Sequence, residues 1–128
     1  MIFSIILLTA FATQAATKTA TVSGNWSNTK TWGGKAVPVA NYIVVINGGV
    51  NVSLDVNTAA ASILLSDMMG CTTSLAVGAF TLNTGSIKLG PRSWGKGSNV
   101  SKTNLSVSIG IINCTGALSY LKQMIPIN

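Results

Sequence analysis

Few side chains in this sequence could act as acids, bases or nucleophiles. The chain has no histidine, and its acidic residues are Asp55 and Asp67. A serine or cysteine nucleophile ordinarily needs a neighbouring base, so the usual catalytic triads are excluded. Two carboxylates could cleave a glycosidic bond, but Asp55 ends a predicted strand and Asp67 precedes a turn, where aspartate favours local capping. We therefore predict no catalytic residue and no enzymatic activity.

A basic stretch that contains one tryptophan is the main candidate for ligand binding. Residues 92–104 are polar, break the rhythm of the segments around them, and are predicted to form a loop. An indole ring among cations could grip an acidic glycan or a nucleic-acid strand. A solvated loop with its tryptophan folded back onto the domain fits the same pattern. The candidate ligand-binding residues are Trp94, Arg92, Lys96 and Lys102.

The other two tryptophans, Trp26 and Trp32, precede the first predicted coils. Their rings could stack on sugars, because an indole offers an apolar face and an N–H donor. Their place ahead of the coils favours burial instead, as a cap over an otherwise open sheet edge. We predict that both are structural cap residues.

Cys71 and Cys114 are the two cysteines, and without any histidine they argue against a zinc site. No metal and no cofactor is predicted. In an oxidising compartment the pair could form a disulfide worth about 3–4 kcal/mol. Two buried free thiols fit the sequence as well, because spacing alone does not bring the Cα atoms within the bridging distance of about 5.5 Å.

Residues 1–16 have the form of a secretory signal peptide. Positions 2–12 are largely apolar, and Ala15 and Ala16 suit a signal peptidase. No basic region precedes the run, which leaves an uncleaved anchor as the alternative, but a membrane span needs roughly 20 apolar residues. No later run is long and apolar enough to cross a bilayer. We predict cleavage near Ala16, a single domain over residues 17–128, and a secreted or cell-surface location.

Composition favours strands over helices. Charged residues make up 8% of the chain, whereas long amphipathic helices normally carry many charges on their wet face. The formal net charge of +6 favours anionic partners. We predict anionic or neutral glycans as partners and no specific nucleic acid.

Short β-favouring segments alternate with turn residues along most of the chain. They are residues 20–22, 42–46, 50–54, 62–65, 74–77, 80–82, 86–89 and 105–112. Such short strands favour a parallel β-helix, although no fixed repeat length is visible. An antiparallel β-sandwich is the alternative, with Asn47-Gly48-Gly49 closing a hairpin over residues 43–54. Residues 116–128 predict either a short helix or a tail.

A series of motifs runs through the first half of the chain. In order they are Gly24-Asn25-Trp26-Ser27, Thr31-Trp32-Gly33-Gly34, Val37-Pro38, Ile43-Val44-Val45-Ile46 and Val50-Asn51-Val52-Ser53-Leu54-Asp55. This series resembles the opening of G8-like, β-helix-containing bacterial surface proteins, over residues 22–90. The resemblance implies an extracellular location, a right-handed parallel β-helix or its cap, and a role in adhesion or glycan contact. It implies no catalytic residue.

The sequence thus predicts a secreted or cell-surface, non-catalytic β-helix module for adhesion or extracellular glycan binding. One alternative is the N-terminal fragment of a polysaccharide-degrading β-helix enzyme. Another is a structural module that self-associates through an open end of the β-helix. Asn-X-Ser/Thr sequons matter in a eukaryotic secretory route, but the bacterial resemblance favours their chance occurrence. They begin at Asn25, Asn51, Asn99, Asn104 and Asn113.

Overall fold

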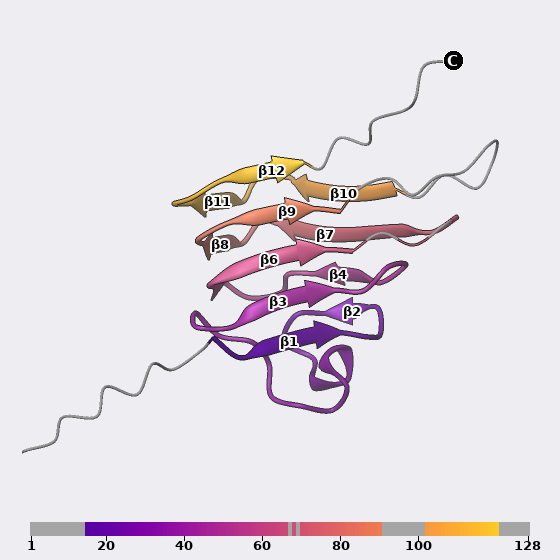
Figure 1. The fold of residues 1–128 in the computed structure, drawn as a ribbon. Coiled ribbons are helices and arrows are strands. Elements are labelled where there is room, and N and C mark those ends of the chain that lie inside the picture. The colour runs from indigo at the N-terminus through magenta and orange to yellow at the C-terminus, as the bar shows by residue number, and fades with distance from the viewer. Residues whose placement is uncertain (1–14, 67, 69, 91–101, 121–128) are drawn as a thin grey trace, which may run out of the picture.

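The computed structural model describes residues 15–66, 68, 70–90 and 102–120, which form an all-β solenoid of about three turns (Figure 1). Strands make up 49% of the structure and helix 4%. Every strand pair in these ranges is parallel. The predicted parallel β-helix is therefore confirmed, and the antiparallel sandwich is wrong. The predicted signal peptide lies outside the described residues except for Ala15 and Ala16, and the first strand begins at Thr17.

Three parallel sheets form the sides of the solenoid. Sheet A has the order β1 (Thr17–Ala20), β3 (Ile43–Ile46), β6 (Ser62–Leu65), β9 (Ile87–Leu89) and β12 (Leu118–Tyr120). Sheet B has the order β10 (Lys102–Val107), β7 (Thr72–Gly78), β4 (Asn51–Ser53) and β2 (Gly24–Asn25). Sheet C has the order β11 (Ile111–Cys114), β8 (Thr81–Thr84) and β5 (Thr58–Ala60).

The coils differ in length, which explains why no repeat is visible in the sequence. In sheet A, Ile43 lies beside Ser62, 19 residues further on. Ile63 lies beside Ile87, 24 residues further on, and Ile87 beside Leu118, 31 residues further on. Most of the extra residues fall in the connections from sheet A to sheet B, between β6 and β7 and between β9 and β10. The strands stay paired because the added residues lie mainly in these connections.

Apolar side chains stack in columns inside the solenoid. Alternate residues of a strand point inward, and parallel pairing places each above its counterpart in the preceding coil. In sheet A, Val44, Ile63 and Ile87 form one such column and are at most 1% exposed. In sheet B, Val52 and Leu75 pair in the same way and are fully buried. Each such burial contributes about 1.5–3 kcal/mol, so the columns hold the coils together.

Trp26 and Trp32 are buried beside the first coil, at 0% and 2% exposure. Their rings meet edge to face, with centroids 5.0 Å apart, and the Trp32 Nε1–H donates to the Trp26 carbonyl at 2.7 Å. Trp32 ends the short 3-10 helix η1 (Thr29–Trp32), which starts where the Asn28 side chain accepts from the Lys30 N–H. It stops at Gly33, whose φ of 68° is a conformation that glycine adopts without strain. This segment lies across the N-terminal end of the solenoid (Figure 1).

Two predictions for the last third of the chain are wrong. The predicted loop 92–104 ends earlier than expected, because Lys102, Thr103 and Asn104 already belong to β10 and pair with β7. The predicted helix or tail from 116 to 128 contains the strand β12, because Leu118 continues the column above Ile87. The remaining tail residues, 121–128, and loop residues 92–101 lie outside the described ranges.

The Asn47-Gly48-Gly49 turn does not close a hairpin. It joins β3 in sheet A to β4 in sheet B, so the two strands lie on different sides of the solenoid. The predicted segment 105–112 is likewise divided, because a turn at 108–110 carries the chain from sheet B to sheet C.

Cys71 and Cys114 are free thiols, so the second of the two predicted alternatives holds and no disulfide joins them. Cys71 lies in the connection from sheet A to sheet B, where its N–H donates to the Met68 carbonyl at 3.0 Å. Cys114 ends β11 in sheet C, with its Sγ 3.7 Å from the Gly85 carbonyl oxygen. The two thiols are thus held at different corners of the solenoid.

Candidate functional site

Most of the residues predicted to bind a ligand lie outside the part of the chain that the structure describes. Arg92, Trp94 and Lys96 lie outside the described residues, and Lys102 is placed only by its backbone, as the first residue of β10 beside Thr72. The predicted aromatic and basic binding site therefore stays a prediction.

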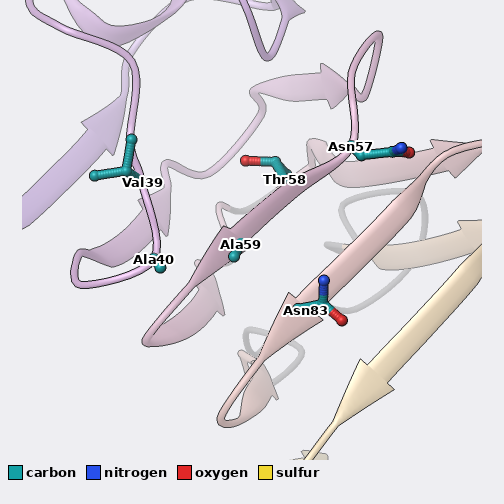
Figure 2. A pocket seen from close by; sticks show the side chains of 6 residues that line it. All are labelled: Val39, Ala40, Asn57, Thr58, Ala59 and Asn83. Atoms are coloured by element: carbon teal, nitrogen blue, oxygen red, sulfur yellow. The ribbon is translucent and has the colours of Figure 1, made fainter.

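An open concavity lies instead on the outer side of sheet C, where the sequence predicted no site (Figure 2). Its volume is about 360 Å³, near the lower end of the range for small-molecule sites. The lining comes from the connection between η1 and β3, from β5 with the residue before it, and from β8. The lining residues are Val39, Ala40, Asn57, Thr58, Ala59 and Asn83.

Backbone hydrogen bonds fix the wall of this concavity that Val39 and Ala40 provide. The Tyr42 N–H donates to the Val39 carbonyl at 3.0 Å, which closes a turn. The Tyr42 carbonyl in turn accepts from the Ala61 N–H at 2.8 Å, at the corner after β5. Pro38 is buried just before the wall. These bonds hold the wall next to β5, which supplies Thr58 and Ala59.

Two asparagines present amide groups at this surface, and the fold sets their orientation. The Asn83 Oδ1 accepts from the Asn113 Nδ2–H at 2.8 Å, across the pair β8 and β11. The Asn57 Oδ1 accepts from the Thr81 N–H at 2.9 Å. Because the oxygen and nitrogen of an amide point apart, each NH₂ group is directed away from its own bond. In Figure 2 the Asn83 nitrogen points towards β5 and the concavity.

No charged side chain is among the residues that line the concavity. The available groups are the Asn83 NH₂ group, the Thr58 hydroxyl, and the small apolar surface of Val39, Ala40 and Ala59. The Asn57 amide lies at the edge of the concavity and extends away from the Val39 wall in Figure 2. Such a set can bind uncharged hydroxyl groups and the apolar face of a ring, but it offers nothing that could neutralise a phosphate or carboxylate.

Asp55 is not among the lining residues and has a structural partner. Both the backbone N–H and the hydroxyl of Ser27 donate to its carboxylate, the former at 3.0 Å. The bond from the Ser27 hydroxyl and then the bond from its N–H lower the pKa of Asp55. The pair links the tryptophan segment to the second residue after β4, which is a structural contact. Asp67, the carboxylate predicted to cap a turn, lies outside the described residues.

The outer side of sheet B is also uncharged along its described side chains. Asn51, Ser74 and Asn104 lie in one row across β4, β7 and β10, and the Ser74 hydroxyl donates to the Asn51 Oδ1 at 2.7 Å.

The sequon residues that the structure describes are all exposed, and they are Asn25, Asn51, Asn104 and Asn113. Asn99 is outside the described ranges. Within those ranges no three potential metal ligands lie together.

Sequence reasoning missed Asn57, Asn83 and the wall at Val39. The one available signal was the alternation in Asn57-Thr58-Ala59-Ala60, which places Ala60 in the core and Asn57 outside. Alanine and threonine in a three-residue strand make that signal weak.

No helix in the part of the chain that the structure describes has the length and apolar character needed to cross a membrane. Comparison with family models, curated proteins and solved structures finds no match.

Proposed function

We propose that this chain is a secreted or cell-surface, non-catalytic module that binds extracellular glycans at the concavity on sheet C. The observation that carries the proposal is the oriented amide group of Asn83 in an uncharged site with a small apolar wall, with the Asn57 amide at its edge. Sugars offer hydroxyl groups for the amides and ring faces for the apolar wall. The resemblance of residues 22–90 to G8-like surface proteins supports the same role.

A neutral glycan fits this concavity better than an anionic one. The lining residues carry no charge, and burying an unpaired anion beside them would cost free energy with no compensating partner. The net charge of +6 and the predicted binding residues Arg92, Trp94, Lys96 and Lys102 would instead serve an anionic glycan. Adhesion through both kinds of contact would follow from their presence on one chain.

The test is binding of the secreted chain to a panel of neutral and acidic glycans, repeated with Asn83→Asp. Aspartate keeps the oxygen that accepts from Asn113 and removes the NH₂ donor that faces the concavity. The loss of one hydrogen bond worth about 1 kcal/mol predicts roughly fivefold weaker binding of a neutral glycan. Asn57→Asp should act in the same direction.

Ser53→Ala is the matched control, because Ser53 is an exposed polar residue on the outer side of sheet B. It should leave binding unchanged. The proposal fails if no glycan binds, or if a glycan binds with equal affinity to the wild type and to both aspartate variants.

A further inference from the structure

We propose that the coil formed by β10, β11 and β12 pairs with the same coil of a second copy of this chain, end to end. We call the exposed rim of this coil, residues 103–120, the C-terminal rim. Within the described residues, each of its strands is the outermost of its sheet: β12 in sheet A, β10 in sheet B and β11 in sheet C. An outermost strand presents unpaired N–H and C=O groups, which can pair with a strand from another chain.

The core of the solenoid is open at this rim. Leu118 continues the column of Val44, Ile63 and Ile87, yet it is 64% exposed, whereas Ile87 directly beneath it is fully buried. In sheets B and C, Leu105 and Ile112 are only partly buried, although the residues with which they pair are fully buried. A second layer of side chains is therefore needed to complete the packing of this coil.

The C-terminal rim has few of the features that protect outermost strands from association. Residues 103–120 include no charged residue and no proline, which are the usual means of blocking an edge. Lys102, the first residue of β10, is the one charged residue of the strands β10, β11 and β12. Val107, Ile109 and Ile111 are large apolar residues there with exposures of 43%, 83% and 56%. A register shift between Ser106 and Val107 makes β10 irregular. We therefore expect β11 and β12 to form most of the hydrogen bonds to the second copy.

The opposite end of the solenoid is protected. The segment with Trp26 and Trp32 lies across it and is tied on by the bond from the Thr21 N–H to the Thr31 carbonyl, at 3.0 Å. The edge strand β1 also carries Lys18, whose Nζ lies 5.1 Å from the centre of the Tyr42 ring. This cover disfavours the stacking of a rim on this end of another copy, so we expect rim-to-rim contact in place of head-to-tail filaments.

A second copy is the occupant that fits, because the rim offers three strand edges arranged around one core. A single peptide strand could pair with only one of them. Two rims related by a twofold axis meet with their strands antiparallel, with one sheet beside its own copy and the other two exchanged. Such a contact closes on itself and gives a dimer.

The experiment is sedimentation of the secreted full chain over a concentration series without glycan, with lysine placed at the rim. The wild type should sediment as a dimer. Leu118→Lys and Ile109→Lys should each raise the dimer dissociation constant by about tenfold or more, because a desolvated lysine would have no partner. Val22→Lys is the control, because Val22 is 54% exposed but lies near the capped end between β1 and β2.

Circular dichroism establishes that each variant keeps its β structure, so a change in mass reports on the contact. A wild type that is monomeric at every concentration would overturn the proposal, as expected if another part of the same chain covers the rim. Filaments in place of dimers would also overturn it, and so would dimers that both rim variants leave intact. Glycan binding is absent from this measurement, so its result is independent of the proposed function.

Discussion

At the scale of single residues, Asn57 and Asn83 show how the solenoid orients polar side chains at its surface. Each uses its amide oxygen in a bond to a neighbouring strand, which leaves its NH₂ group directed outward. A side chain that is already oriented loses little conformational entropy when a ligand binds. Two amides can therefore contribute useful affinity in a shallow, uncharged site.

Asp55 is held ionised by Ser27, and this has a consequence for acid stability. The bonds from the Ser27 hydroxyl and N–H lower the pKa of Asp55 below its ordinary value of 3.8. A carboxyl group with a lowered folded pKa stabilises the fold above its unfolded pKa, and this contribution is lost as pH falls through the folded pKa.

We therefore expect the melting temperature to fall as the pH drops below the ordinary pKa of 3.8, and Ser27→Ala to reduce this fall. Thermal unfolding followed by circular dichroism over a pH series measures both effects. Ser53→Ala, which alters an exposed serine without a bond from its hydroxyl to Asp55, should keep the wild-type acid dependence. If Ser27→Ala also keeps it, the assigned role of the pair is wrong.

At the scale of elements, the two tryptophans of the cap differ in one respect that can be measured. The Trp32 Nε1–H donates to the Trp26 carbonyl, whereas the Trp26 Nε1–H is buried without a hydrogen-bond partner in the structure. Both rings are nearly or fully buried, so the loss of ring volume in a change to phenylalanine is similar at the two positions.

Trp32→Phe should therefore destabilise the fold by about 1–2 kcal/mol more than Trp26→Phe. The first change leaves a buried carbonyl without its donor, and the second removes a donor that was already unsatisfied. Denaturant unfolding followed by circular dichroism gives the two free energies of unfolding. Equal losses, or a larger loss for Trp26→Phe, would contradict the hydrogen bonding described for the cap.

The elements that the sequence predicted well are those with a clear alternation of large apolar residues. The segment 62–65 matches β6 fully, and 43–46 forms β3 within the predicted 42–46. The strand β5 was missed because its core residue is Ala60, whose small side chain leaves no apolar signal. The strand β12 was missed because Leu118 makes sense only as the next member of a column that begins in distant coils.

At the scale of the whole molecule, the coils differ in length, so the sequence shows no fixed repeat, and the candidate site combines residues from separate coils. The site joins residues 39–40, 57–59 and 83, which lie in separate coils and in the connection before them. Their proximity follows from the register between β5 and β8, which places Ala59 beside Asn83. No short-range pattern encodes that register, because connections of variable length separate the strands. The fold class was therefore predictable from local sequence, and the site was not.

The most direct test of the proposed site is a nuclear magnetic resonance titration of the nitrogen-15-labelled chain with each neutral glycan of the panel. Side-chain NH₂ signals of asparagine report on Asn57 and Asn83 individually. We predict that these two signals and the backbone amides of residues 39–40 and 57–59 shift together and saturably, while those of Asn51 and Ser53 on sheet B stay in place. Saturable shifts confined to other parts of the chain would contradict the proposed site, and an absence of shifts with every glycan in the panel would contradict the proposed function.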